Sequence, residues 1–242
     1  MNGLLRTRTD DGIELLRLDR PQVRNALDTA TLDALLVAFG ELVADRDLRA
    51  LVVSTTDPVA LCAGADVGER LDRVGGIARM ERFAGLYAAL TDVPVPTIAV
   101  CVGNVVGAGA ELAAACDLRV AGDNLKLAWA GAKLGVPVGP ARLVPLVGLA
   151  RAKELVYTGR VVGAEEAARI GLAERVVPAA EAERAAVELA SEIARRPPEG
   201  LRRLKAMFRD GEDLVGRTAR ENAILLDWQR HGSGLPQGRD RA

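Results

Sequence analysis

Apolar positions along the chain fall into short β-branched runs and longer stretches with helical spacing. The runs 51–54 and 97–102 are short and mostly apolar, which predicts strands buried in a sheet, and 13–18 is predicted as a further short strand. Between them, apolar residues recur every three or four positions over 31–43 and 70–90, which predicts helices. Strands that alternate with longer helices indicate right-handed crossovers around a parallel sheet, and therefore an α/β fold.

Capping and helix-breaking residues mark the ends of these helices. Asp28 and Thr29 precede the first helix and suit an N-cap, because their side-chain oxygens can accept hydrogen bonds from its first turn. A glycine pair at 75–76 interrupts or delays the second helix. Pro94 and Pro96 end that helix and lead into the next strand.

The pattern changes after residue 178, where only helical spacing is found. Three helices are predicted in this part of the chain, over 181–195, 197–208 and 212–230. A Gly-rich segment follows them, which predicts a short flexible tail. We therefore divide the chain into a core, 1–178, and a C-terminal helical assembly region with its tail, 179–242.

Length and charge limit the partners. The chain has 242 residues, and its 32 basic and 33 acidic side chains give a formal charge of −1, which argues against nucleic acid or an anionic membrane as the main partner. Residues 1–11 are polar and do not resemble a signal peptide. The stretch 98–116 has the length of a membrane span, but Asn104, Glu111 and three glycines interrupt it. We expect a cytoplasmic protein.

The cysteines and the histidine give no sign of metal or triad chemistry. Cys62, Cys101 and Cys116 lack metal-ligand spacing and are expected to be reduced and buried. Cys62 adjoins the candidate site described next, so a nucleophilic role is an alternative, but no histidine is near it in sequence. His231 is the single histidine and is expected to be exposed in the Gly-rich tail.

Two loops of small residues follow strands, at 61–66 and 103–113. Small residues let backbone N–H groups approach a ligand closely, and a helix N-terminus adds unpaired donors and a positive dipole end. Two such donors converging on one oxygen form an oxyanion hole, worth roughly 2.7–4 kcal/mol of barrier per donor. Glu111 stands in the otherwise apolar run 110–116, where burial is costly without a role or a partner. Its alternative role is to complement the helix dipole.

Four segments in this order resemble the motifs of the enoyl-CoA hydratase/isomerase (crotonase) superfamily. A-G-A-D at 63–66 is similar to the family's A-G-A-D loop, and 103–117 is similar to its G-x-x-x-G-G-G-x-E loop and following C-D. R-P and N-A-L within 20–27 resemble its opening motif, and T-G-R, A-E-E-A and G-L within 158–172 resemble a later one.

The resemblance implies a crotonase-like (ClpP/crotonase) spiral of ββα turns with a C-terminal helical trimerisation region. It assigns the oxyanion hole to the N–H groups of Ala65 and Ala108, and the catalytic carboxylate to Glu111. The family prefers Gly at position 108, but a backbone donor survives the change, so we expect a narrower pocket and an intact hole. Binding of the CoA and acyl groups is expected to involve Arg24, Ala26, Ala63, Gly64, Asp66, Val67, Gly107, Trp129 and Gly131.

Hydratases of this family carry a second Glu, and it maps to Gly131, because Leu134-Gly135 and Pro137 remain in step after it. Hydration needs a base for the water and an acid for the α-carbon. One carboxylate can still relay a proton between two carbons, or assist a decarboxylation, hydrolysis or bond cleavage through an enolate. The sequence therefore favours isomerase or lyase chemistry.

Other residues have assigned or alternative roles. Arg24 is a candidate for a CoA phosphate and Lys205 a weaker one, whereas Asp66 and Asp117 are expected to anchor loops. The acyl pocket is expected to use Trp129 and residues of the helix 70–90, namely Met80, Phe83, Leu86 and Tyr87. For Trp129 the alternative is ordinary core packing, or filling of the space left by the absent Glu.

Our hypothesis from the sequence is an acyl-CoA-processing enzyme with one catalytic Glu. It acts on an acyl-CoA thioester, with no metal and no cofactor beyond the CoA moiety, as a homotrimer or a dimer of trimers. Two alternatives stay open. One is a catalytically weak or inactive acyl-CoA-binding protein of this fold, and the other is an RNA-binding homologue, which the near-zero net charge disfavours.

Overall fold

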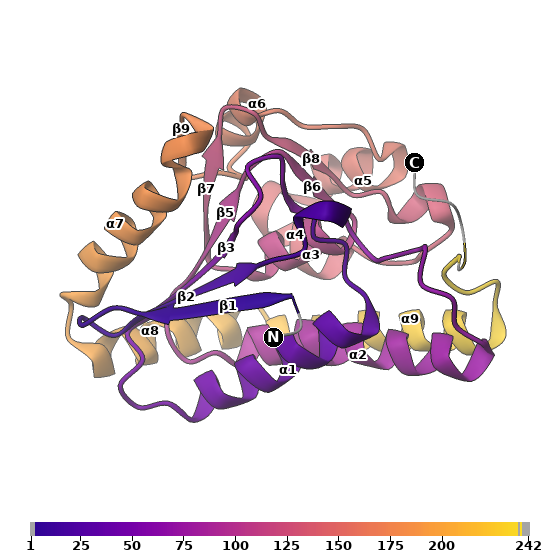
Figure 1. Ribbon diagram of the computed structural model, residues 1–242, viewed down its shortest axis with the longest axis horizontal. Coiled ribbons are helices and arrows are strands. Elements are labelled where there is room, and N and C mark those ends of the chain that lie inside the picture. Colours follow the sequence, from indigo (N-terminus) through magenta and orange to yellow (C-terminus); the bar gives the residue numbers. More distant parts are fainter. Residues whose placement is uncertain (1–2, 237, 239–242) are drawn as a thin grey trace.

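The computed structural model describes residues 3–236 and 238 (Figure 1). The strands are β1 (Leu4–Arg8), β2 (Ile13–Leu18), β3 (Ala50–Thr55), β4 (Ala60–Cys62), β5 (Thr97–Cys101), β6 (Asn104–Val106), β7 (Leu118–Gly122), β8 (Lys126–Ala128) and β9 (Arg175–Val177). The α-helices are α1 (Thr29–Ala44), α2 (Arg73–Asp92), α3 (Ala108–Ala115), α4 (Pro140–Val147), α5 (Leu149–Thr158), α6 (Ala164–Arg169), α7 (Ala182–Ala194), α8 (Pro198–Gly211) and α9 (Leu214–His231).

The strands form two sheets that are built turn by turn. One sheet has the order β1-β2-β3-β5-β7-β9 and is parallel except for β1, and the other has the parallel order β4-β6-β8. Three successive turns, β3-β4-α2, β5-β6-α3 and β7-β8-α4, each give their first strand to the large sheet and their second to the small one. This is the predicted spiral of ββα turns.

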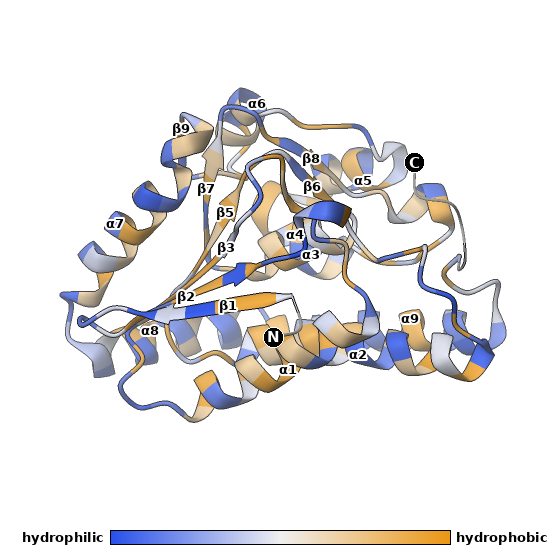
Figure 2. Ribbon diagram, in the orientation of Figure 1, coloured by the Kyte–Doolittle hydropathy of each residue, from blue (hydrophilic) through white to orange (hydrophobic). Residues whose placement is uncertain are grey.

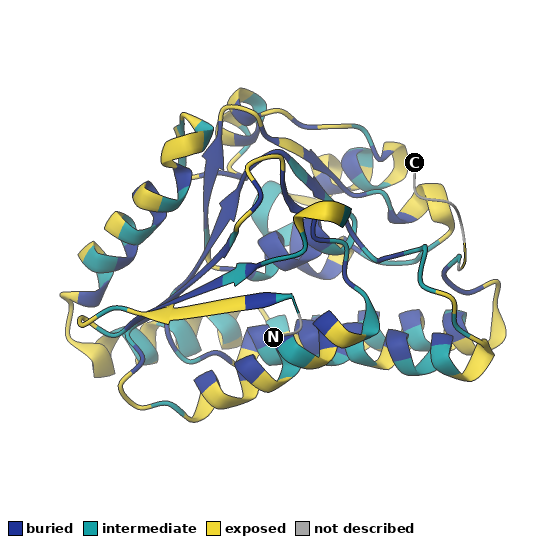
Figure 3. Ribbon diagram, viewed as in Figure 1, coloured by how far each residue is buried: buried dark blue, intermediate teal, exposed yellow. Residues whose placement is uncertain are grey.

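Helices cover both faces of the large sheet, and its central strands β3, β5 and β7 are mostly apolar and almost entirely buried (Figures 2 and 3). Every residue of β5 is buried, as a strand with two covered faces requires. The alanines of α7 pack on one face, together with Ile13, Val52 and Val100. Residues of α1, α2 and α3 pack on the other face, and α2 lies between α1 and α9 (Figure 1).

The region after residue 178 therefore shares its core with the rest of the chain. α7 buries its alanine stripe on the large sheet, and Leu225 of α9 belongs to the same apolar cluster as the residues of α1 and α2. One residue of the tail packs into the core. Leu235 is buried, and its N–H donates to Gln229 Oε1 at 2.9 Å. Its side chain fills an apolar site, and the flexibility of the tail stays a prediction.

Aspartate side chains cap the N-termini of α1 and α2, at Asp28 as predicted and at Asp72, which was not predicted. The Asp28 carboxylate accepts from Thr31 N–H at 2.8 Å, and Asp72 accepts from Gly75 N–H at 2.7 Å, so the glycine pair lies in the first turn of α2. Strand β1 was not predicted. Of its five residues only Leu4 is buried, because β1 is an edge strand, and so it leaves no apolar run in the sequence.

The apolar stretch 98–116 is divided among β5, β6 and α3, as the interruptions by polar residues and glycines predicted. Among the described residues, no helix is both long and apolar enough to cross a membrane.

Candidate active site

Two loops lie against each other because glycine backbones allow it. A Cβ on Gly109 of α3 would lie 2.2 Å from the carbonyl oxygen of Cys62, so only glycine lets α3 approach the end of β4 this closely. Gly64 has φ +111°, a conformation that L side chains rarely adopt, and a Cβ there would lie 3.1 Å from Val106 O and 3.8 Å from Ala108 N. The predicted oxyanion loops are therefore neighbours.

The N–H groups of Ala65 and Ala108 have no hydrogen-bond partner among the described residues. Ala108 is the first residue of α3, where a helical N–H has no intrahelical acceptor. It does not adopt a positive φ, so a methyl group at this position costs no backbone strain. Both alanines line one cavity of about 240 Å³.

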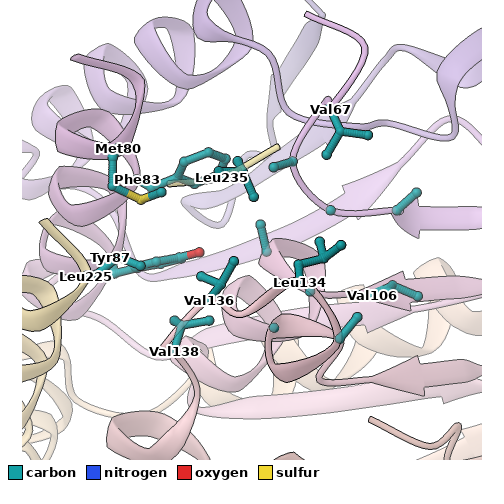
Figure 4. Close-up of a pocket in the computed structure, with 17 residues that line it drawn as sticks. Val67, Met80, Phe83, Tyr87, Val106, Leu134, Val136, Val138, Leu225 and Leu235 are labelled. Atoms are coloured by element: carbon teal, nitrogen blue, oxygen red, sulfur yellow. The ribbon is translucent and has the colours of Figure 1, made fainter. Parts of the chain in front are cut away.

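The cavity is almost entirely apolar (Figure 4). Five further predicted binding residues line it, namely Ala63, Gly64, Val67, Gly107 and Gly131. Met80, Phe83 and Tyr87 of α2 also line it, as predicted for the acyl pocket, whereas Leu86 faces the core. Sequence reasoning missed the remaining apolar lining: Val106, Ala130, Leu134, Val136, Val138, Leu225 and Leu235.

A shallow depression continues from this cavity along the loop 63–67. Arg24, Ala26 and Asp66 line it, and it shares Ala63, Ala65 and Val67 with the cavity. Ala63 N–H donates to Arg24 O at 2.9 Å, and Leu27 N–H donates to Gly64 O at 2.8 Å, so the two loops are joined by backbone hydrogen bonds. The depression gives an elongated ligand a route out of the cavity past the exposed Arg24.

The predicted anchoring residues are held within the fold. Asp66 is buried and accepts from Gly68 N–H at 3.1 Å, and Asp117 accepts from Thr97 N–H at 2.7 Å. Lys205 donates to Asp117 at 2.7 Å and lines neither the cavity nor the depression. The structure thus gives Lys205 a structural partner, not a position beside the predicted site.

Glu111 is buried behind the cavity wall and not on it. Its Oε2 accepts a hydrogen bond of 2.7 Å from Arg142 Nε, and its Oε1 has no partner among the described residues. A Cβ on Gly139, which follows the cavity-lining Val138, would lie 3.2 Å from Oε1. The alternative role as a mere dipole-complementing Glu does not describe this side chain, which sits in a buried ion pair.

The ion pair has a third member, which sequence reasoning missed along with Arg142. Arg142 Nη2 also donates to Glu221 of α9, whose other oxygen accepts from Ala141 N–H at 2.8 Å. A lone Arg in the apolar run 136–147 was a usable signal of burial. Glu221 lies on the buried stripe of α9, which consists of Thr218, Glu221, Leu225 and Gln229, and this helical spacing was a signal too.

Burial raises the pKa of Glu111 to about 7, because Arg142 offsets only part of the desolvation and the negative charge of Glu221 acts in the same direction as burial. A carboxyl with a pKa near neutrality exchanges protons readily at physiological pH, which is the property that general acid–base chemistry requires.

Trp129 does not reach the cavity. Its side chain is buried in the core, where its Cδ1 lies against Gly139, so the structure gives no support to the prediction that it binds substrate. At position 131 the cavity wall is tightly closed, since a Cβ on Gly131 would lie 2.9 Å from Val136 O. Position 131 therefore carries no carboxylate and has no room for a side chain.

Cys62, the alternative nucleophile, is buried, and burial disfavours its reactive thiolate form. Burial raises the pKa of the Cys62 thiol to about 12, so it stays protonated at neutral pH. Cys62, Cys101 and Cys116 are all buried free thiols, as predicted. His231 is exposed as predicted, but it ends α9 rather than lying in the tail, and it pairs with Asp227 at 2.9 Å.

Comparison with known families decides the affiliation of the chain. A sequence model described as "Enoyl-CoA hydratase/isomerase" matches residues 8–227. The chain belongs to this family. It is 36% identical, over all of its length and 97% of the relative, to YngF of Bacillus subtilis (strain 168), whose name places it among the enoyl-CoA hydratases/isomerases. It is 33% identical to the mitochondrial methylglutaconyl-CoA hydratase of Mus musculus, over 88% of this chain and 71% of that protein.

Solved structures agree with this affiliation. The crystal structure of an enoyl-CoA hydratase of Mycobacterium smegmatis superposes with a TM-score of 0.79 at 30% identity, over 93% of this chain and 91% of that one. DspI of Pseudomonas aeruginosa gives a TM-score of 0.82 at 30% identity, over 94% and 88% of the two chains. The chain is thus a crotonase-fold enzyme of the hydratase/isomerase family.

Proposed function

We propose that this enzyme stabilises the enolate of an acyl-CoA thioester and moves a proton with one carboxylate, so that it isomerises or cleaves its substrate in preference to hydrating it. The observation that carries the proposal is the pair of unpartnered N–H groups of Ala65 and Ala108 on one apolar cavity. In a cavity that excludes water, each donor to a developing oxyanion is worth roughly 2.7–4 kcal/mol of barrier.

The shape of the site supports a thioester substrate. The cavity of about 240 Å³ accommodates an acyl group and not a whole CoA molecule. The depression along Arg24, Ala26 and Asp66 gives the rest of the CoA a path to solvent. In our proposal the thioester carbonyl lies between the two amides, the acyl chain points toward α2, and the reaction uses no metal and no cofactor beyond the CoA moiety.

Glu111 is the proposed proton carrier, through Oε1. This oxygen has no hydrogen-bond partner in the part of the chain that the structure describes, whereas Oε2 accepts from Arg142 Nε. A carboxyl with a pKa of about 7 can take a proton from one carbon and return it to another, at similar cost in both directions. Because Glu111 follows Ala108 by three residues in α3, the oxyanion donor and the carboxylate move as one rigid unit.

We propose isomerase or lyase chemistry because the described cavity wall carries no carboxylate that could act as a second base. No Asp or Glu side chain lines the described cavity, and Gly131 leaves no space for one. A water nucleophile would need its own base while Glu111 serves the α-carbon. Proton relay between two carbons needs one group only.

The direct test compares isomerisation and hydration, with substrates whose acyl groups have the same length. We expect the purified protein to convert 3-enoyl-CoA to 2-enoyl-CoA faster than it hydrates 2-enoyl-CoA, measured by absorbance of the conjugated thioester and by mass spectrometry. Glu111→Gln should lower the rate by roughly 10²–10⁴-fold, whereas the exposed Glu188→Gln should leave it unchanged. Hydration as fast as isomerisation would overturn the proposed reaction type.

A second variant tests the oxyanion hole. Ala108→Pro removes the N–H donor at the first position of α3, where proline fits a helix. We expect a loss of roughly 10²–10³-fold in turnover with a preserved circular dichroism spectrum. Unchanged turnover in a folded Ala108→Pro protein would exclude this donor.

The burial of Glu111 favours one alternative, a catalytically weak or inactive acyl-CoA-binding protein. Glu111 is not on the described cavity wall, and a carboxylate locked to Arg142 could serve stability alone. One measurement distinguishes the enzyme from the binding protein. Acyl-CoA binding without deuterium exchange at the α-carbon in D₂O would favour the binding protein, whereas exchange that depends on Glu111 favours the enzyme.

Assembly and location belong to the same proposal. We propose a cytoplasmic homotrimer or dimer of trimers built through the C-terminal helices. Exposed apolar side chains on α8 and α9 support this, namely Leu204, Met207, Phe208, Val215 and Ile224. Light scattering coupled to gel filtration would give a mass of three or six chains, and a monomer would exclude it.

A further inference from the structure

One polar side-chain group faces the otherwise apolar cavity. Of the residues that line the described cavity, Tyr87 alone carries a side chain with a hydrogen-bonding oxygen or nitrogen. Figure 4 shows its ring between α2 and the cavity, with the hydroxyl oxygen directed into the space near Val136. Tyr87 is only 3% exposed, and its hydroxyl has no hydrogen-bond partner among the described residues.

An unpaired hydroxyl in such a place is costly unless a ligand or water completes it. A buried donor without an acceptor costs about 1–3 kcal/mol. An apolar acyl chain that filled the cavity would displace water and leave this donor without an acceptor. An acyl group with an oxygen at the right carbon would instead accept a hydrogen bond from this donor.

The ring that carries the hydroxyl is held in place. The Arg142 guanidinium lies over it, with Cζ 4.3 Å from the ring centroid, and Phe83 packs beside it with a centroid separation of 6.3 Å. Arg142 is itself fixed by Glu111 and Glu221. The position of the hydroxyl is thus set before a ligand arrives, which reduces the entropic cost of using it.

The hydroxyl is a permanent donor. Burial is the main cause that raises the pKa of Tyr87 above its usual range, and the charge of Glu111 adds to it, while Arg142 opposes it. The group therefore stays protonated at any pH at which the protein works. It can donate to a neutral or anionic oxygen.

We propose that the cavity recognises an acyl thioester whose acyl group bears a hydrogen-bond-accepting oxygen, as hydroxyl, oxo or carboxylate, which accepts from the Tyr87 hydroxyl. This inference rests on the proposed acyl-CoA function and adds the chemical class of the acyl group to it. Tyr87 acts here as a specificity-determining residue, at the side of the cavity formed by α2, away from the loops of the oxyanion donors (Figure 4).

The test uses pairs of saturated acyl-CoAs that differ by one oxygen. Isothermal titration would compare each C4 to C6 parent with its hydroxy, oxo and carboxy derivatives, substituted at successive carbons. We expect one derivative to bind the native protein roughly 3- to 10-fold more tightly than its parent. Tyr87→Phe should remove that preference and leave the affinity for the parent equal or higher. Tyr157→Phe is the matched control, because this second tyrosine is exposed and lies outside the cavity.

The outcomes separate the two levels of the proposal. If no acyl-CoA binds, the proposed function fails. If acyl-CoAs bind but oxygen gives no preference, or Tyr87→Phe keeps the preference, only this inference fails. Should Tyr87→Phe not fold, ¹³Cζ-tyrosine NMR of the native protein decides: the Tyr87 signal, assigned with Tyr157→Phe, should shift with the oxygen-bearing acyl-CoA beyond its shift with the parent, and equal shifts overturn the inference.

Discussion

Arg142 Nε donates a hydrogen bond of 2.7 Å to Glu111 Oε2, and each side chain is only 1% exposed. Arg142 also holds Glu221, so the buried cluster contains two carboxylates and one guanidinium. Burial is the main cause that raises the pKa of Glu111 although an arginine touches it, and the negative charge of Glu221 adds to this effect. The proposed proton carrier is therefore also part of a buried ion cluster that bears on fold stability.

Removing Arg142 should strongly destabilise the protein. Arg142→Met leaves two buried carboxylates without their cation, and breaking a buried ion pair in this way costs about 3–5 kcal/mol. The measurement is the free energy of unfolding in urea at pH 7.5. Arg203→Met is the control, because Arg203 is exposed and pairs only with Glu199 one turn earlier; it should change the free energy by less than about 0.5 kcal/mol. A loss no larger than that of the control would contradict the buried cluster.

Removing the charge of Glu221 should shift the pH dependence of catalysis. Glu221 raises the pKa of Glu111, so Glu221→Gln should lower it and leave Arg142 to pair with Glu111 alone. Because the base form of Glu111 takes the proton, the rise of α-proton exchange with pH should move to lower pH. Deuterium exchange of a saturated acyl-CoA, followed by mass spectrometry from pH 5 to 9, measures this. A shift to higher pH, or none, would show that Glu221 does not act on Glu111.

Protonation of Glu111 should also appear in stability. Its pKa is about 7 in the folded protein and near the ordinary 4.5 when unfolded, so the folded state binds more protons between these values. The ionised carboxylate therefore lowers stability above pH 7, and this cost disappears as the pH falls toward 4.5. Relative to Glu111→Gln, the native protein should gain up to about 3 kcal/mol between pH 8 and pH 5. Parallel pH profiles of the two proteins in urea titrations would exclude a raised pKa.

Much of the fold follows from local sequence signals. Asp28 caps α1 as predicted, and the apolar runs at 51–54 and 97–102 form buried central strands. Strand β1 escaped prediction because an edge strand with one buried residue leaves no apolar run. These outcomes depend on contacts close in sequence or on burial of whole segments.

The site was predictable where backbone chemistry decides it and less so where distant side chains meet. Gly64 and Gly109 allow two loops to touch, as the small residues of both loops predicted, and the oxyanion hole between them stays a prediction. The partners of Glu111 lie far away in sequence, with Arg142 31 residues later and Glu221 a further 79. No local pattern records which buried charges will pair. For the same reason Leu235, at the end of the chain, gave no sign that it lines the cavity.

Gly109 should prove indispensable to both stability and substrate binding. In Gly109→Ala the new methyl would lie 2.2 Å from the backbone oxygen of Cys62. A backbone atom cannot move aside as the end of a flexible side chain can, so α3 itself would have to shift. We expect a loss of about 1–3 kcal/mol or more in the free energy of unfolding, and weaker acyl-CoA binding, because α3 must move away from the loop that carries Ala65. Gly200→Ala in α8 is the control: nothing lies within 4 Å of the added methyl, so alanine should be neutral or stabilise by up to about 1 kcal/mol. Equal stability and equal acyl-CoA affinity of the two variants would show that the close approach of α3 to β4 does not position the two amide donors.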